Sequence, residues 1–253
     1  MKNKTLFIAA THGDEGLGVA ACQNLKQTRN DFDWMIGNEP AYKKQVRYID
    51  TDLNRSAPGN INSTSFEERR AADIIQKTKN YSYTIDIHGA KNKMGICLIV
   101  TKITKENLRL ASYIDVETIL IWPSITPEMQ YPLSEYFPCG LEIECGDKYN
   151  PNTTKQLTKI LSTFLNTLEK KEQWTEDQCI AMLKTKKIYT MYGTIETPKN
   201  TEKKKFRELK EITYNNERFT PVFIQTYKDY TNIFCYKLQK TTINEITKLM
   251  DTQ

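Results

Sequence analysis

The sequence predicts an α/β protein, with a mixed central sheet flanked by helices and a smaller β-rich domain toward the C-terminal end. Short apolar runs alternate with helical patterns through the first two-thirds of the chain, as strands and helices do in one α/β domain. An amphipathic helix ends this alternation near residue 170, and short β-like runs follow it. We therefore predict one domain over residues 1–170 and a second over residues 171–253.

The elements of the first domain follow from its hydrophobic pattern. Short apolar runs are predicted as buried strands at residues 6–10, 84–87, 95–101, 118–122 and 141–145. Helices are predicted over residues 18–25 and 65–79. The second helix begins with Ser65-Phe66-Glu67-Glu68, which we interpret as a capping box in which the Ser65 hydroxyl and the Glu68 carboxylate satisfy free amides.

A third helix is predicted from residue 155, because apolar side chains recur there at helical spacing and form one stripe: Leu157, Ile160, Leu161, Phe164, Leu165 and Leu168. Beyond it, β-like runs cover residues 187–196, 219–226 and 232–238. The Lys/Glu-rich stretch 199–211 lies between two of these runs, and we expect it to be a solvated loop or hairpin.

Composition excludes several classes of protein. The 36 Lys and Arg exceed the 31 Asp and Glu by only five, and this mild, evenly spread charge does not indicate nucleic acid as a partner. No run approaches the roughly 18 apolar residues of a membrane helix, and the apolar run at residues 6–10 is too short for a secretion signal. The six cysteines form no C-x-x-C pair, which indicates buried reduced thiols in a cytoplasmic protein.

The two histidines of the chain both lie next to predicted strands. His12 follows the first strand in Thr-His-Gly-Asp-Glu, and His88 follows a later one in Asp-Ile-His-Gly. Ligands collect at strand ends in α/β folds, and His12 and Glu15 can face one ion across a turn. Two imidazoles and one carboxylate leave a position open for water, as a catalytic zinc requires. A lone H-x-x-E is usually a surface turn, so the spacing by itself leaves both interpretations open.

Two further segments carry groups suited to catalysis. Asn54 and Arg55 offer an amide and a planar guanidinium that can hold a carboxylate, and Arg47 can stabilise an oxyanion. Glu142 and Glu144 lie two apart on a predicted strand and therefore point the same way. Glu144, at the end of that strand, is the natural general base. The alternatives are an ordinary surface loop and an exposed strand face.

Taken together and in order, these residues resemble the succinylglutamate desuccinylase/aspartoacylase family of the zinc carboxypeptidase superfamily. The resemblance extends from residue 6 to about residue 146 and rests on four motifs. These are His12-Gly13-Asp14-Glu15, Arg47 with Asp52-Leu53-Asn54-Arg55, Asp86-Ile87-His88 followed by Met94-Gly95, and Ile143-Glu144-Cys145-Gly146. The fold that the family implies is zinc carboxypeptidase-like, with residues 1–170 as the catalytic domain and residues 171–253 as an accessory domain at the active-site entrance.

The resemblance implies a metal site and a reaction. His12, Glu15 and His88 would bind one Zn²⁺ per chain, Glu144 would act as general base and acid, and Arg47 would polarise the scissile carbonyl. The reaction is hydrolysis of an amide bond in a small N-acyl amino acid or a related conjugate. The corresponding alternatives are a zinc carboxypeptidase acting on peptides and a zinc-binding module without turnover. Retention of Glu144 and Arg47 argues against the last of these, because a binding module needs neither residue.

The resemblance also implies how the substrate is held. Asn54 and Arg55 would bind a substrate carboxylate, and Asp52 would orient a ligand histidine. A family tyrosine from the C-terminal part would correspond to Tyr227 or Tyr230, between which the sequence does not choose. The sequence also leaves the oligomeric state open, with a homo-oligomer among the alternatives.

One departure from the family pattern bears on the substrate. Family members acting on N-acylated acidic amino acids carry a further arginine shortly before the catalytic glutamate. Here, residues 110–147 contain neither Lys nor Arg. A second substrate carboxylate would be left without a partner, and a buried unpaired charge is costly. We therefore expect N-acetylaspartate and succinylglutamate to be poor substrates.

Overall fold

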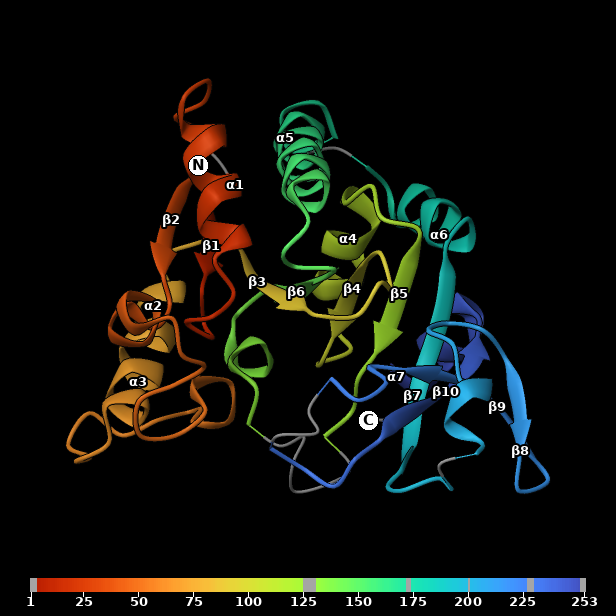
Figure 1. Cartoon of the computed structure of the whole chain (residues 1–253). Helices are drawn as coiled ribbons and strands as arrows, with labels where there is room; N and C mark the ends of the chain where they lie inside the picture. The colour runs from red at the N-terminus through yellow and green to blue at the C-terminus, as the bar shows by residue number, and fades with distance from the viewer. Residues whose placement is uncertain (1–3, 125–130, 172–173, 200, 227–229, 251–253) are drawn as a thin grey trace.

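A computed structural model describes residues 4–124, 131–171, 174–199, 201–226 and 230–250. Its described strands form one mixed sheet in the order β2-β1-β3-β6-β4-β5-β7-β10-β9-β8, with helices packed on both faces (Figure 1). The predicted fold class is thus confirmed. The strands are β1 (Thr5–Ala9), β2 (Asp33–Ile36), β3 (Tyr83–Ala90), β4 (Ile96–Val100), β5 (Thr118–Ile121), β6 (Gly140–Gly146), β7 (Lys187–Ile195), β8 (Ile212–Tyr214), β9 (Glu217–Val222) and β10 (Cys235–Thr241). The helices are α1 (Leu17–Lys26), α2 (Glu39–Lys44), α3 (Phe66–Thr78), α4 (Lys105–Tyr113), α5 (Pro151–Lys171), α6 (Glu176–Lys184) and α7 (Ile243–Met250), with short 3-10 turns η1 (Leu53–Arg55), η3 (Leu133–Tyr136) and η4 (Lys203–Lys205).

Strand β1 shows how the two faces of the sheet are filled. Phe7 packs on one face against Phe32 and Phe164 of α5, with ring centroids 5.2 and 6.3 Å apart. Ile8 points to the other face and packs with Ile74 of α3. Both faces are covered, so every residue of the strand is buried and its sequence is apolar nearly throughout. Each such large side chain stabilises the fold by roughly 1.5–3 kcal/mol.

The C-terminal strands continue the same sheet. Strand β7 pairs in parallel with β5, from Thr118 opposite Lys187 to Ile121 opposite Thr190. Strand β10 then pairs antiparallel with β7 and with β9. The β-rich character of this segment agrees with the sequence pattern. Strands from both sides of residue 170 belong to this one sheet, and the division into two domains at that residue stays a prediction.

Several elements were not predicted from the sequence, namely β2, α2, α4, α6, β8 and α7. Strand β2 has only four residues and begins with a charged one, so its pattern is too short to recognise. Helix α6 did carry a signal, because Thr175 and Gln178 form a capping box before it. Among the described residues, no helix is both long and apolar enough to cross a membrane.

The capping box predicted at Ser65 is wrong. Ser65 does precede α3, but its side chain makes no capping hydrogen bond, and Oδ2 of Asp50 accepts from the Phe66 amide at 2.8 Å instead. The neighbouring Glu67 is fully buried and accepts from Nδ2 of Asn38 at 2.9 Å and from the Ile49 amide at 2.7 Å. A side chain of the first helical turn therefore binds amides of the preceding loop. Those amides lie at the edge of the core, where an unpaired amide costs more than it does at an exposed helix end.

The Lys/Glu-rich stretch is only partly the solvated loop that we expected. Its lysines at η4 are accessible, but Phe206 is buried in a cluster with Phe219 and Phe234. Glu208 accepts hydrogen bonds from the backbone amides of Phe223 and Ile224 at 2.9 and 2.8 Å. An apolar residue and an inward carboxylate among the charges anchor this stretch to the sheet.

Candidate active site

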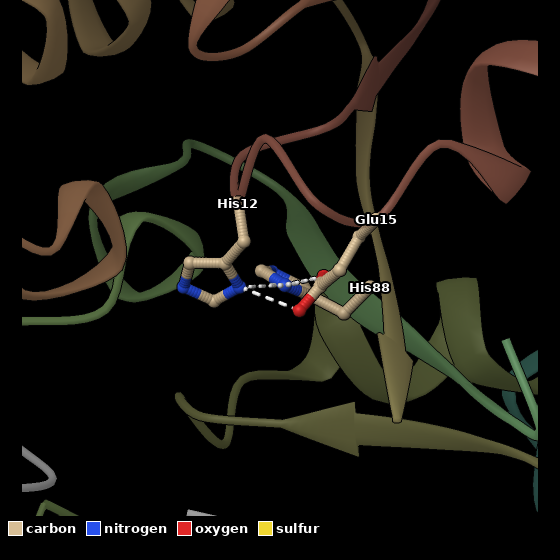
Figure 2. Close-up of side chains that lie close together, drawn as sticks. All are labelled: His12, Glu15 and His88. Atoms are coloured by element: carbon tan, nitrogen blue, oxygen red, sulfur yellow. Dashed lines mark hydrogen bonds and ion pairs between the residues drawn. The ribbon is translucent and has the colours of Figure 1, made fainter. Parts of the chain in front are cut away.

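Three side chains meet where β1 and β3 end (Figure 2). Nδ1 of His12, in the loop after β1, lies 2.9 Å from Oε1 of Glu15, and Nδ1 of His88 lies 3.3 Å from Oε2 of the same carboxylate. The two Nδ1 atoms are 3.3 Å apart. All three residues are buried, and their ligand atoms lie within 4.8 Å of one another, a group that could hold a metal ion. His88 is a residue of β3 itself rather than of the loop after it.

The opposite nitrogen of each ring faces an aspartate. Nε2 of His12 lies 3.0 Å from Oδ1 of Asp52, and Nε2 of His88 lies 3.1 Å from Oδ2 of Asp86. The Thr11 hydroxyl donates to the other Asp86 oxygen at 2.6 Å. A carboxylate at Nε2 favours the tautomer with its proton there and leaves the Nδ1 lone pair for a cation. Our sequence analysis quoted Asp86 in the motif of His88 but gave it no role, although Asp-x-His on a strand puts both side chains on one face.

The charges of this cluster suit a cation. Burial lowers the pKa of His88, but Asp86 and Glu15 outweigh burial, and the pKa is raised well above its usual value. Burial also raises the pKa of Glu15, yet His12 and His88 lower it well below the ordinary range. Two imidazole nitrogens 3.3 Å apart beside an ionised carboxylate attract a positive charge, which either a shared proton or a bound cation supplies. Two nitrogens and one carboxylate are also the donor set of a zinc site with an open position, so these residues fit Zn²⁺.

The register of β3 and β6 brings the predicted base to this cluster. His88 pairs with Glu144 across the two strands, and Asp86 pairs with Glu142, so the four side chains share one face. Both glutamates are buried and line the same cavity as the histidines, as their spacing predicted. Burial, followed by the charge of Glu15, raises the pKa of Glu144 to about 8.

Arg47 and Asp52 form a second pair at the edge of the cluster. Nε and Nη2 of Arg47 donate to Oδ2 of Asp52 at 3.1 and 2.9 Å, while Nη1 lies 3.7 Å from Oε1 of Glu15. Burial raises the pKa of Asp52, but His12 and Arg47 bring it well below the ordinary range. Asp52 therefore stays ionised and links the arginine to His12.

The predicted carboxylate-binding pair lies on η1, and both members line the cavity. Asn54 has protein partners for its amide: Oδ1 accepts from the Leu133 amide at 2.9 Å, and Nδ2 donates to Glu142 at 3.2 Å. Nη1 of Arg55 donates to the Asn54 carbonyl at 2.6 Å. The structure thus places both residues at the cavity, with Asn54 held by buried neighbours.

Gly13 fits the loop after β1 against the arginine segment. A Cβ atom at this position would lie 2.1 Å from the Ala41 carbonyl carbon, so no other residue can be accommodated without movement. Its amide donates to the Arg47 carbonyl at 3.1 Å. The glycine therefore brings His12 and Arg47 to neighbouring positions.

Aromatic residues from distant segments form one wall of the cavity. Trp122 follows β5, Phe223 follows β9, and Tyr236 belongs to β10. The Trp122 ring centroid lies 4.8 Å from that of Tyr236 and 5.5 Å from that of Phe223. The sequence analysis missed all three, because no local pattern connects them. Of the two tyrosines considered there, Tyr230 has its ring 5.2 Å from Cζ of Arg47, and Tyr227 lies outside the described residues.

The family and the relatives of this chain identify it as an amidohydrolase. The chain belongs to the succinylglutamate desuccinylase/aspartoacylase family, because the model of that family's catalytic domain matches residues 2–170. A probable aspartoacylase from Prochlorococcus marinus (strain AS9601) is 26% identical over 220 residues, which cover 78% of this chain and 71% of the relative. An N-acyl-aromatic-L-amino acid amidohydrolase (carboxylate-forming) from Xenopus laevis is 28% identical over 134 residues, 46% of this chain and 44% of the relative.

Solved structures share the fold across almost the whole chain. Murine aminoacylase 3 has a TM-score of 0.74 at 17% identity and covers 96% of this chain and 97% of its own. Succinylglutamate desuccinylase from Chromobacterium violaceum has a TM-score of 0.69 at 13% identity and covers 96% and 86%. The similarity includes the C-terminal β-rich segment, so the fold predicted from the sequence is confirmed. The family resemblance is confirmed by the match to the catalytic-domain model.

Proposed function

We propose that the chain is a zinc-dependent amidohydrolase that removes the acyl group from a small N-acyl amino acid with a free carboxylate. One observation carries this proposal: the Glu15 carboxylate contacts the Nδ1 atoms of both His12 and His88, and Glu144 pairs in register with His88 in the same buried cavity. Family membership and the names of the relatives support the reaction class.

The metal site consists of His12, Glu15 and His88, with one Zn²⁺ per chain. When bound, the ion would supply Lewis-acid polarisation of the carbonyl and activation of the attacking water. Asp52 hydrogen-bonds Nε2 of His12, and Asp86 lies close to Nε2 of His88, so that a carboxylate near each Nε2 favours the ligating tautomer. Because the two aspartates lie against the far side of each imidazole, the three ligands need little rearrangement on binding an ion.

The remaining groups move the proton and hold the substrate. Glu144 accepts a proton from the attacking water at its carboxylate and then delivers it to the leaving amine nitrogen. Arg47, fixed by Asp52, places a positive charge where the carbonyl oxygen becomes negative. Arg55 binds the substrate carboxylate through its guanidinium, and Asn54 positions Arg55 through its carbonyl oxygen.

One wall of the cavity suits a neutral, apolar substrate side chain. Trp122, Phe223 and Tyr236 offer an aromatic wall, which agrees with the aromatic substrate named for the Xenopus relative. The first cationic residue in the sequence after residues 110–147 is Lys148. Its Nζ already pairs with Oδ2 of Asp14 at 2.6 Å. We infer an N-acylated aromatic or apolar amino acid as the substrate class.

Metal analysis and turnover of N-acetyl-tyrosine by the purified protein test this function. We expect about one zinc per chain, release of free tyrosine, loss of both on treatment with a chelator, and recovery when zinc is returned. His88→Ala should lose the metal and the activity together. Absence of turnover in a zinc-loaded protein would contradict the proposal, and faster cleavage of an N-blocked dipeptide would favour the peptide-cleaving alternative.

A second assay tests the substrate class. We expect kcat/KM for N-acetylaspartate to be at least about a hundredfold below that for N-acetyl-tyrosine, because a second carboxylate would be buried without a cation. Succinylglutamate should be similarly poor. Comparable values for N-acetylaspartate and N-acetyl-tyrosine would refute the inferred preference while leaving the reaction class intact.

A further inference from the structure

Phe223 enters the aromatic wall from an unusual backbone conformation. Its φ is +56°, in the left-handed region that bulky residues seldom adopt. The side chain is 2% exposed, and its ring centroid lies 5.5 Å from Trp122 and 6.2 Å from Tyr236. Such a conformation persists only where surrounding groups over-determine it. The groups that hold it therefore control the position of the wall.

Glu208 binds two backbone amides at this position. Its Oε2 accepts from the Phe223 amide at 2.9 Å, and its Oε1 accepts from the Ile224 amide at 2.8 Å. Nδ2 of Asn92 donates to the same Oε1 at 2.5 Å. One carboxylate thus fixes two successive amides of the turn, and hydrogen bonds to a charged acceptor are stronger than neutral ones.

Asn92 connects this turn to the strands that carry the reacting groups. Its Nδ2 also donates to the Ile224 carbonyl at 2.5 Å, and its Oδ1 accepts from the Thr226 hydroxyl at 2.6 Å. The Asn92 carbonyl accepts from the Asp147 amide at 2.6 Å. Asn92 follows β3, and Asp147 follows β6. The turn therefore has a fixed position relative to the strands of His88 and Glu144.

We propose that Glu208 is a positioning residue for substrate selection: by fixing the turn at Phe223, it holds the aromatic wall in place for a bulky apolar side chain. The inference rests on the proposed function, because it assigns the wall to the substrate of that same cavity. Glu208 acts through Phe223 and not on the reacting atoms. Its loss should therefore change which side chain is accepted, while the chemistry on a small substrate continues.

Two substrates separate selection from chemistry in the zinc-loaded Glu208→Ala variant. We expect KM for N-acetyl-tyrosine to rise about tenfold or more, and kcat/KM for N-acetylglycine to stay within about twofold of wild type. Glu211→Ala is the matched control, because Glu211 belongs to the same stretch, is 51% exposed and pairs with Arg218. Equal losses on both substrates, or none on either, would overturn the proposal.

A double-mutant cycle tests whether Glu208 acts through the ring. Phe223→Leu should reproduce the loss of selectivity, and adding Glu208→Ala to it should cause little further loss. Glu208→Gln keeps one carbonyl acceptor, so its selectivity should fall between wild type and Glu208→Ala. If Glu208→Ala does not fold, Glu208→Gln decides: unchanged selectivity in that variant contradicts the proposal. Fully additive effects in the cycle would do the same.

Fluorescence tests the positioning role without any turnover. Trp122 is 8% exposed and touches Phe223, and its signal is isolated by comparison with a Trp122→Phe variant. Acrylamide should quench Trp122 more strongly in Glu208→Ala than in wild type or in Glu211→Ala. Unchanged quenching overturns the positioning role. Failure of the wild-type enzyme on both substrates, with the quenching difference present, would instead refute the proposed function alone.

Discussion

Each histidine of the cluster presents one ring nitrogen to Glu15 and the other to a different aspartate. Asp52 and Asp86 come from a loop and from β3, respectively, and neither is near the other in sequence. This arrangement fixes both imidazoles before any ion arrives, so the two aspartates should influence metal affinity more than they influence folding.

Replacing Asp86 by Asn should weaken zinc binding. We expect the affinity to fall about 10–100-fold, because the amide no longer supports the basicity and tautomer of His88. Competition with a chromophoric chelator measures the change. Asp73→Asn is the matched control, since Asp73 is an accessible carboxylate on α3 that pairs with Arg70. Equal affinities in all three proteins would contradict the role of Asp86.

Replacing Glu144 by Gln should separate catalysis from metal binding. The amide cannot accept the proton, so kcat should fall by about 10²–10⁴ while the zinc content stays at wild-type level. Single-turnover kinetics and metal analysis on one preparation provide both numbers. Glu169→Gln, a change at a carboxylate that is 63% exposed on α5, should leave kcat unaltered. Full activity in Glu144→Gln would exclude it as the proton carrier.

At the scale of elements, the start of α3 supports the arginine loop. Glu67 is fully buried and accepts from Asn38 and from the amides of Ile49, Asp50 and Thr51. That loop ends with Asp52, which binds both His12 and Arg47. The helix therefore positions the cluster without contributing to the cavity itself.

Replacing Glu67 by Ala should destabilise the protein by about 1–3 kcal/mol, because the loop amides and Asn38 lose their acceptor. It should also lower kcat/KM, since Arg47 and Asp52 would no longer be held. Urea unfolding and steady-state kinetics measure the two effects. Glu68→Ala, its neighbour on the same helix, should cost less than about 0.5 kcal/mol. Similar losses in both variants would mean that helix propensity, and not the loop, is responsible.

The elements differ in how far the sequence reveals them. The strand at residues 6–10 was evident because β1 is buried on both faces and therefore uniformly apolar. The helix at α3 was predicted with nearly correct bounds, yet its capping was wrong, because the sequence does not say which amides are buried. Helix α4 went unpredicted although Thr104 caps it through the Asn107 amide, a signal that is short and common.

The sequence identified the candidate residues that lie in short motifs. It did not identify those that come together only because the sheet places distant strands side by side. His12, Glu15, His88 and Glu144 lie in recognisable motifs at strand ends. The aromatic wall comes from three strands that only the order β5-β7-β10-β9 brings together. In the sequence, Glu208 is one of several charged residues in the stretch 199–211. Only the structure reveals its hydrogen bond to the Phe223 amide.

At the scale of the whole molecule, the sheet is continuous through the position where we predicted a domain boundary. Strand β5 has β7 as a neighbour, and Leu120 of β5 packs with Met191 and Leu238 of the C-terminal segment. A chain ending at residue 170 would expose both an unpaired strand edge and apolar side chains.

Residues 1–170 expressed alone should therefore form aggregates instead of a folded monomer. The reason is the exposed edge of β5, which would pair with other chains. Size-exclusion chromatography and circular dichroism of the fragment and the full chain measure the outcome. A monomeric fragment with cooperative unfolding would demonstrate that the first domain is independent of the second.

The continuity of the sheet also has a consequence for how this enzyme could diversify. The proposed zinc ligands and proton carrier all come from the first 144 residues, whereas Phe223 and Tyr236 lie after β9 and in β10. If the proposed role of the aromatic wall is correct, changes in this segment should alter which N-acyl amino acid is accepted and leave the proposed zinc ligands and Glu144 in place. A mutant library confined to residues 206–236 should therefore yield variants with new substrate specificity, because it leaves the proposed zinc ligands and Glu144 unchanged.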